Sequence, residues 1–462
     1  MKSFLVTAFV IIMTLGLTSQ AMAAPMTLDD CIELALKTRA SIVRARGNEI
    51  SAAADQRSAL GAFLPSLSAQ WSWSKGKETD IEPGGYHYTA FGEVFDTFDV
   101  GGETHYDHGY LPTDSVFAYP ADQDLGPSKQ LWLGADATFS ISRIYSYAAA
   151  KANHARAKLD VIASEQDLIY SVKVAYYAYL ANVQNLETQQ EAVKRADEQL
   201  KLIESRFELG SAARSDVLKQ KVQYGNDRLA LLKAVNAVTN SRANLAYTVG
   251  LDPRDDHEFD TEYNVREYDG TLDEAISFGV NHNPSLLSQQ KTVDWAKHSA
   301  RAAKATWLPS VSGSYSISKF DGTQNYPEVF DYSSVTKRWG FSFNWNIFDG
   351  FSRHERIQNA KVSHNNSRAD FADLRNYTVS NIKTGYSEID QYKEQKAVSE
   401  ENVAAADEDL KITQEKYNLG AATILDLLDA QVSLKEAQVS LISVDFDLNL
   451  AIAKLEKSMG KM

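Results

Sequence analysis

A break between two long helical segments occurs twice in this sequence. The first copy reads FELGSAARSDVLK over 207–219, and the second reads YNLGAATILDLLD over 417–429, which lies 210 positions later. Around these breaks, residues 176–250 match residues 386–460 without a gap. A repeat at a fixed spacing indicates that each copy builds the same structural unit. The chain is therefore expected to fold as a tandem structural repeat with a helical hairpin in each half.

The openings of the two halves also match each other. Residues 27–66 correspond to residues 271–310 without a gap, at an offset of 244. Thr27 is placed to cap a short helix, because a threonine side chain at this position accepts a hydrogen bond from a free amide of the first turn. We expect the first repeat to span residues 24–262 and the second to span residues 263–462.

The first residues have the pattern of a cleaved signal peptide over 1–23. Lys2 precedes an apolar run over 4–17, and the small residues Ala-Met-Ala follow. No later stretch of about 20 apolar residues exists, so no transmembrane helix is expected. Cys31 is the only cysteine, which excludes an intrachain disulfide. Its repeat equivalent is Ala275, which indicates an ordinary packed helix position.

Proline is absent from two long stretches, residues 128–252 and 328–462. Both are rich in good helix formers, which favours very long helices, and we expect helical hairpins over 147–250 and 353–460. An apolar seam with a step of seven residues predicts supercoiled packing against neighbouring helices. In the first hairpin this seam consists of Val172, Tyr179, Leu186, Val193, Leu200 and Phe207.

Each half also has two shorter helical segments. They are expected at about 40–63 and 215–249 in the first half, and at 284–307 and 424–459 in the second. Each pair has about the length of one long helix, so two short helices stacked end to end would match the long helix beside them. Each half could then contribute two full-length helical columns to a helical barrel: one long helix, and one pair of short helices stacked end to end.

Between the helices, the hydrophobic period changes from helical to alternating. Strands are expected at about 65–74 and 131–141 in the first half, and at about 309–318 and 338–348 in the second. Segments of about ten residues with one aromatic-rich face and one small polar face are typical of a membrane barrel. A soluble β-sandwich also alternates and is the other interpretation. Four strands cannot close a barrel, so strands that span a membrane require several chains to share one barrel.

The long loop over 75–130 is acidic and is expected to face the outside of a barrel. His87, His105 and His108 in this loop could bind a metal with nearby carboxylates, but no compact ligand spacing appears, and a solvated loop is the favoured interpretation. We therefore expect neither a metal nor another cofactor. The net charge is −14 and no basic stripe exists, which argues against nucleic acid or an anionic membrane surface as a partner.

The doubled order of these motifs resembles the TolC-type outer membrane efflux protein family. It consists of the Thr-Leu-Asp openings, the Leu-Pro entries to strands, the Phe-x-x-Gly and Tyr-x-x-Gly breaks, and a Leu-Leu-Asp-Ala-Gln run ending at Gln431. The resemblance covers nearly the whole mature chain. It implies an α+β fold: a homotrimeric outer-membrane channel in which four β-strands per chain form a shared 12-stranded barrel. This barrel continues into a long coiled-coil α-helical barrel in the periplasm.

The resemblance also implies a gate at the periplasmic end. The tip turns contain Gly210 and Gly420. The family's link arginine, two residues after the second glycine, is Ala422 here, so that tether is absent. By position in the motifs, the constriction aspartates are Asp426 and Asp429, and the residues that link the hairpins are Ser215, Asp216 and Tyr417.

The residues themselves add a physical argument for the gate. Asp426 and Asp429 are three positions apart and share one helix face, so threefold symmetry would make two acidic rings. Such rings would resist tight closure and favour entry of cations. The alternative is that carboxylates simply favour the first turn of a helix, and for Asp216 the two interpretations carry equal weight. Arg214, where the second copy has Ile424, is a candidate replacement tether.

The sequence therefore predicts a passive exit duct for efflux or type I secretion. The implied partners are a periplasmic adaptor and an inner-membrane pump or ABC transporter, with outer-membrane lipid around the strands. No nucleophile-base arrangement and no glycine-rich phosphate loop exist, so we expect no enzyme. A secreted coiled-coil adhesin or structural stalk is the alternative; it would explain the heptads and the signal peptide but not four alternating strands.

Overall fold

The computed structural model describes residues 25–79, 97–100, 103–106, 122–262, 266–321 and 334–462. The signal peptide expected over 1–23 lies outside this description, as do His87 and His108. The chain divides into two compact units. A helical unit contains Met1–Ser58, Tyr145–Lys304 and Ser352–Met462, and a strand unit contains Ala59–Ile144 and Ala305–Phe351.

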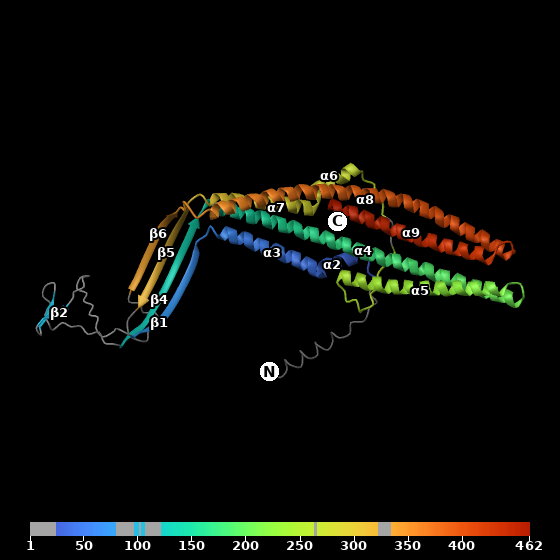
Figure 1. The fold of residues 1–462 in the computed structure, drawn as a ribbon, viewed down its shortest axis with the longest axis horizontal. Coiled ribbons are helices and arrows are strands. Elements are labelled where there is room, and N and C mark those ends of the chain that lie inside the picture. Colours follow the sequence, from blue (N-terminus) through green and yellow to red (C-terminus); the bar gives the residue numbers. More distant parts are fainter. Residues whose placement is uncertain (1–24, 80–96, 101–102, 107–121, 263–265, 322–333) are drawn as a thin grey trace, which may run out of the picture. The chain divides into compact units, whose positions relative to one another are not determined.

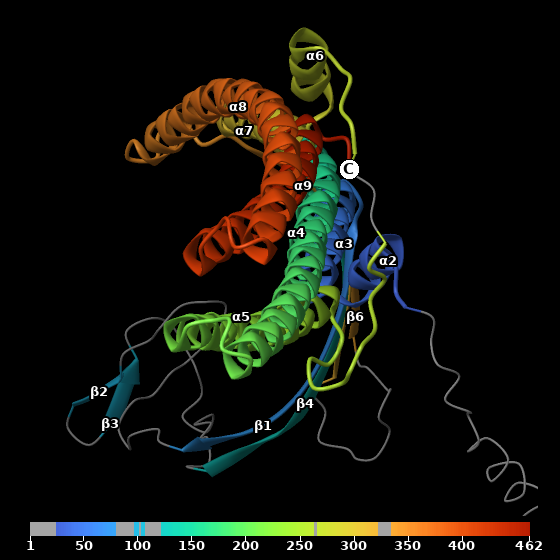
Figure 2. The ribbon, with the colours of Figure 1, turned by 90° about the vertical axis from the view of Figure 1, so that its right-hand side faces the viewer.

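Helices of nearly equal length recur in the two halves of the chain (Figures 1 and 2). Those of the first half are α2 (Leu28–Thr38), α3 (Ala40–Gly61), α4 (Ile141–Glu208) and α5 (Arg214–Val249). Those of the second half are α6 (Leu272–His282), α7 (Pro284–Ala305), α8 (Ser352–Asn418) and α9 (Ile424–Met459). The long helices α4 and α8 have 68 and 67 residues, and α5 and α9 have 36 each. Within the described residues, no helix is both long and apolar enough to cross a membrane.

In each half, the junction between the first two helices contacts the C-terminus of the 36-residue helix, α5 or α9. Carbonyl groups in the last turn of a helix lack partners within that helix. In the first half, Thr38 Oγ1 donates to the carbonyl of Val249 at 2.9 Å. In the second half, Asn283 Nδ2 donates to the carbonyl of Ser458 at 2.9 Å. The chain between two short helices therefore caps the end of α5 or α9.

The α2 helix packs into the main apolar core of the helical unit. Cys31 and its repeat equivalent Ala275 are both buried, as the sequence comparison predicts. Burial raises the pKa of the Cys31 thiol to about 12, so the thiol stays protonated at neutral pH. Tyr176 and Val172 from α4 lie in the same cluster. The predicted cap is also present, since Thr27 and the third residue of α2 exchange side-chain and backbone hydrogen bonds.

The strand unit contains a four-stranded antiparallel sheet in the order β1-β4-β5-β6. Its strands are β1 (Ser66–Thr79), β4 (Asp122–Phe139), β5 (Ser310–Asp321) and β6 (Ser334–Asn344). Directly opposed residues share a face, and the register places serines opposite one another. Thr138 Oγ1 donates to Ser312 Oγ at 3.2 Å, and Ser74 Oγ lies 2.8 Å from Ser128 Oγ. One face of the sheet is therefore mostly polar, with Trp132 and Phe320 as aromatic exceptions, and the other is mostly aromatic and aliphatic.

The strands differ from the predicted ones mainly at their ends. The predicted strand over 65–74 extends to Thr79, and the predicted strand over 131–141 begins at Asp122. Backbone pairing continues there into residues without apolar alternation, which the sequence pattern does not reveal. The predicted strand over 338–348 instead spans Ser334–Asn344, because Asn344 already pairs with Ser310, the first residue of β5. Within the predicted acidic loop, β2 (Thr97–Val100) and β3 (Glu103–Tyr106) form a short hairpin.

Candidate functional site

The two tip turns connect α4 to α5 and α8 to α9 (Figure 1), and they have the same backbone geometry. Gly210 and Gly420 have positive φ angles of 75° and 74°. In each turn the amide of the next residue, Ser211 or Ala421, donates at 2.8 Å to the carbonyl five residues earlier. This hydrogen bond and the left-handed glycine form a helix C-cap of the Schellman type. The predicted tip glycines therefore end α4 and α8 by the same mechanism.

The helices that leave the two tips begin differently. Thr423 and Asp426 form a capping box at the start of α9: the Asp426 carboxylate accepts from the Thr423 amide and hydroxyl, both at 2.7 Å. These hydrogen bonds lower the pKa of Asp426. The corresponding residue of the first tip is Ala213, whose side chain offers no cap. The helix-start interpretation therefore accounts for the position of Asp426 in this structure.

A small apolar cluster joins the two tips of one chain. Ile203 from α4 is buried against Ile424 and Leu427 from α9. Tyr417 and Val217 pack against this cluster from the ends of α8 and α5. Within the cluster, residues from both hairpins exclude water together, so one chain already holds its own pair of tips side by side.

An arginine that the sequence interpretation missed connects the tips. Arg206 Nη2 donates to Asn418 Oδ1 at 3.0 Å, and the Arg206 guanidinium lies 5.4 Å from the centre of the Tyr417 ring. Partial burial raises the pKa of the Tyr417 hydroxyl, and the nearby Asp216 carboxylate raises it further, whereas Arg206 lowers it. Arg206, Tyr417 and Asp216 thus form one electrostatic group across the two hairpins.

Other predicted gate residues are not brought into this group. Arg214 is exposed and forms no hydrogen bond or ion pair with any residue that the structure describes. Ser215 Oγ donates only to its neighbour Asp216, at 3.3 Å. Within the described chain, Arg206 is the arginine that contacts the other hairpin, and the tether expected at Arg214 stays a prediction. Asp429 is exposed on α9, as Asp426 is.

Arg206 carried a weak signal in the sequence. It lies in the last turn of α4, where a basic side chain is ordinary because it complements the helix dipole. The informative partner is Asn418, 212 positions away, and only the fold brings the two together.

A second link between the hairpins lies further from the tips. Lys435 Nζ of α9 contacts Asp227 Oδ1 of α5 at 2.8 Å, and Asp227 is only 4% exposed. Gln223 Nε2 donates to the other Asp227 oxygen at 3.0 Å. A buried carboxylate needs such partners, because burying an unpaired charge is costly.

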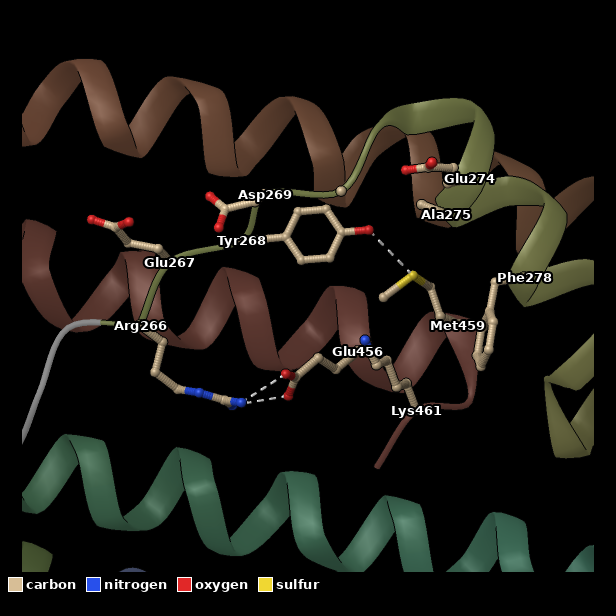
Figure 3. Close-up of a pocket in the computed structure, with 11 residues that line it drawn as sticks. Arg266, Glu267, Tyr268, Asp269, Glu274, Ala275, Phe278, Glu456, Met459 and Lys461 are labelled. Carbon is tan, nitrogen blue, oxygen red and sulfur yellow. Dashed lines mark hydrogen bonds and ion pairs between the residues drawn. The ribbon is translucent and has the colours of Figure 1, made fainter.

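A pocket of about 420 Å³ lies at the C-terminal end of α9, and none of the predicted gate residues lines it (Figure 3). Its charged groups already have structural partners. Glu456 forms a bidentate ion pair with Arg266, with distances of 2.9 and 3.0 Å, and also contacts Lys173 at 3.2 Å. Tyr268 points its hydroxyl at the Met459 sulfur, and Glu274 caps α6. These contacts attach the segment before α6 to α9.

The described residues contain no group of three or more His, Cys, Asp or Glu side chains that could hold a metal ion. Of the three loop histidines, only His105 falls within the described chain, in β3.

Comparison with known proteins gives consistent similarities. The chain is 22% identical to the outer membrane efflux protein BepC of Brucella suis over 298 residues, which cover 64% of this chain and 64% of BepC. It is 23% identical to the outer membrane protein TolC of Vibrio cholerae over 65% of this chain and 69% of that protein. The aligned region thus spans about two thirds of each relative. The crystal structure of the CmeC outer membrane channel of Campylobacter jejuni matches with a TM-score of 0.76 at 16% identity, over 94% of this chain and 85% of CmeC.

The match to CmeC confirms the predicted fold, four strands per chain with long helices in a tandem repeat. The model of the outer membrane efflux protein family matches residues 139–251 and 279–461, which include both hairpins and both tips. The predicted resemblance is confirmed, and this chain belongs to the outer membrane efflux protein family.

Proposed function

We propose that three copies of this chain form a passive exit duct through the outer membrane, with the helices in the periplasm and the tips at the closed entrance. The observation that carries this proposal is the open sheet with one apolar face. Its edge strands β1 and β6 have no partner within the described sheet. Unpaired backbone groups are not tolerated in hydrocarbon, so β1 of one copy would pair with β6 of the next.

The number of strands supports three copies rather than two. Two copies would give a barrel of about eight strands, whose interior is filled by side chains. Three copies are the smallest ring with room for a lumen. Each interface would join different surfaces of the two copies, which closes into a ring under threefold rotation.

Exposed apolar residues on the helices support the same assembly. On α5, one stripe with coiled-coil spacing contains Leu218, Val222, Leu229 and Leu232, and each is more than half exposed. On α3, Val43 and Ile50 lie seven positions apart and are also exposed. Stripes of this kind bury themselves against a neighbouring helix. In a trimer that neighbour is the next copy.

At the entrance, we propose that Arg206 holds the two hairpins of each copy together. Its contacts with Asn418 and Tyr417 replace the family tether that is absent at Ala422. Asp426 and Asp429 would line the constriction as exposed carboxylates, with Asp216 beside Tyr417. A periplasmic adaptor and an inner-membrane pump or ABC transporter would open the entrance; cargo and energy source belong to those partners.

The family consists of channel proteins, and we propose that this chain likewise carries no enzymatic activity and binds no nucleic acid. A secreted adhesin or stalk is the competing function. An adhesin or stalk would also contain paired long helices, but it does not explain why one face of the sheet is aromatic and exposed.

Fractionation of cells that express the full chain tests the duct. We expect the mature protein in the outer membrane, as a detergent-stable particle with about three times the mass of one chain, and conducting when reconstituted in a planar bilayer. Crosslinking in intact cells, followed by mass spectrometry, should identify an adaptor at the tips. A soluble, periplasmic monomer would contradict the proposal.

A further inference from the structure

Among the side chains that the structure describes, the apolar face of the sheet carries one lysine from each of its four strands. In the register, Lys129 of β4 lies opposite Trp73, and Lys319 of β5 lies opposite Leu131. All members of this lysine row share that face: Lys75 on β1, Lys129 on β4, Lys319 on β5 and Lys337 on β6. Lys75 belongs to it because it follows Trp73 by two positions, and side chains along a strand alternate between faces.

The four lysines form a diagonal across one end of the sheet. From one strand to the next, the lysine is displaced by two residues along the strand. Lys319 lies opposite Leu131, two residues from Lys129, and Lys337 lies opposite Ile317, two residues from Lys319. Diagonal neighbours of this kind are about 7–8 Å apart. The row lies at the end where β1 and β5 finish and β4 and β6 begin. At the other end, the described residues of the same face are uncharged, among them Leu67, Phe139, Val311 and Phe343.

The charge of this face is opposite in sign to that of the whole chain. The protein has a net charge of −14, yet the row contains four lysines and one acid, Asp321, which pairs with Lys129 in the register at the end of β5. Asp136 and Arg338 belong to the polar face. Exposed aromatic residues border the row on the apolar face, among them Trp71, Trp73 and Trp339. The negative net charge of the whole chain therefore does not reveal this local basic surface.

A lysine on the lipid-facing side of a barrel is costly at mid-membrane but nearly neutral at the interface. The flexible stem lies along apolar surface while the ammonium group reaches toward the headgroups. In the single chain Lys75 and Lys337 are exposed and Lys319 is partly exposed, whereas Lys129 is only 8% exposed. Lysines at one end of the described face, and none at the other, match a membrane whose two headgroup layers differ in charge. Basic clusters next to an apolar surface attract phosphate-bearing headgroups.

We propose that the lysine row binds the phosphates of an anionic glycolipid in the outer leaflet. The inference rests on the proposed function, which places the loop end of the strands at the outer surface. Lysines in a diagonal row can contact a headgroup with more than one phosphate at several points, whereas a single-phosphate glycerophospholipid offers only one. The proposed partner is therefore a multiply phosphorylated glycolipid and not a single-phosphate glycerophospholipid.

Lipid binding to the detergent-solubilised, full-length mature trimer tests the proposal. Native mass spectrometry would compare bisphosphorylated lipid A with its monophosphorylated and dephosphorylated forms, and with phosphatidylglycerol. For the unchanged protein we expect affinity to fall with each phosphate removed, and phosphatidylglycerol to bind more weakly than bisphosphorylated lipid A. In the variant K75Q/K129Q/K319Q/K337Q, affinity for bisphosphorylated lipid A should fall about tenfold or more, while the corresponding Lys→Arg variant should retain it.

The matched control is K37Q/K201Q/K233Q/K411Q, which removes four exposed lysines of the helical unit and should leave affinity unchanged. If the fourfold Lys→Gln variant does not assemble, the double variant K319Q/K337Q replaces it, and we expect a smaller loss of affinity for bisphosphorylated lipid A. Equal affinity of the Lys→Gln variants and the unchanged trimer, or equal binding of phosphatidylglycerol, would overturn the proposal. A chain that is never a membrane trimer overturns the duct itself, whereas a conducting trimer without phosphate-dependent binding overturns only the lysine row.

Discussion

At the scale of single residues, the tips show how one missing side chain is replaced from elsewhere. Ala422 cannot tether the second hairpin, and we propose that the guanidinium of Arg206 on the first hairpin takes this role. Arginine suits this position because one planar group can donate to the Asn418 amide oxygen and lie near the Tyr417 ring at once. The link therefore joins two hairpins of the same copy.

Replacing Arg206 with alanine should loosen the entrance. The variant loses both the hydrogen bond to Asn418 and the cation–π contact, so we expect a higher closed-state conductance in planar bilayers, by about twofold or more. Arg206→Lys should be intermediate, because lysine keeps the charge but not the planar donor. Arg214→Ala is the control and should conduct as the unchanged protein does. If Arg214→Ala opened the pore and Arg206→Ala did not, the link would be misassigned.

The capping box at the second tip gives a local stability prediction. Thr423→Ala removes the side-chain cap of α9, which typically costs about 1 kcal/mol. Hydrogen exchange of the amides over 424–427 should accelerate about fivefold. In the first tip, Ala213→Thr places a threonine three residues before Asp216, where a capping box can form. Exchange at the start of α5 should then slow, and unchanged rates at both tips would contradict the predicted role of the caps.

The same cap predicts how the second tip responds to acid. Asp426 has its pKa lowered by the Thr423 hydrogen bonds, from the usual value of 3.8. A carboxyl group with a lowered folded-state pKa stabilises the fold above its unfolded pKa, and loses that contribution as pH falls through the folded value. Exchange over 424–427 should therefore stay constant from pH 7 to 5, after correction for intrinsic rates. Acceleration in that range would show that another group controls this cap.

How far the sequence predicts the gate is clear from these same residues. The glycine turns follow from local patterns, because a helix break requires a left-handed residue wherever it occurs. Tyr417 was named only through the family resemblance. Arg206 did not follow from a local pattern, since its partner is distant in the chain and its local setting is ordinary. Arg214 looked distinctive only because its repeat equivalent is apolar.

At the scale of elements, α5 and α9 are held together by a buried ion pair as well as by apolar packing. Removing one partner of such a pair leaves an uncompensated charge, which typically costs about 3–5 kcal/mol. Lys435→Met should therefore lower the thermal unfolding midpoint of the solubilised protein. The double variant Asp227→Leu with Lys435→Met should recover most of the loss, because both charges are then gone. Equal destabilisation by the single and double variants would contradict this account.

The elements also show which parts of the fold a sequence pattern can predict. The long helices follow from composition and the absence of proline, and their ends agree with the predicted ends within a few residues at the tips. The strand ends do not, because pairing near the loops depends on the backbone of the partner strand. Lys75, Lys129 and Lys319 interrupt the apolar pattern just where the strands continue, so alternation alone ends the strands too early.

At the scale of the whole molecule, the two faces of the sheet should tolerate charge differently. Phe341 is 80% exposed on the apolar face, and its neighbour Ser342 belongs to the polar face opposite Ser312. Charges on a lipid face cost up to about 2–4 kcal/mol, whereas lumen positions tolerate them. Phe341→Lys should reduce the amount of trimer in the outer membrane, measured by fractionation, and Ser342→Lys should not. Equal assembly of both variants would contradict the lipid-facing assignment.

The tips present one more repeated residue, just before each glycine. Leu209 and Leu419 are 83% and 84% exposed, among the most exposed large apolar side chains of the described chain. A partner that covers the tips removes these leucines from water, six of them in a trimer. Burial of apolar surface lowers the heat capacity, so docking should have a negative heat-capacity change. Calorimetry at several temperatures should then show the binding enthalpy becoming more favourable as the temperature rises.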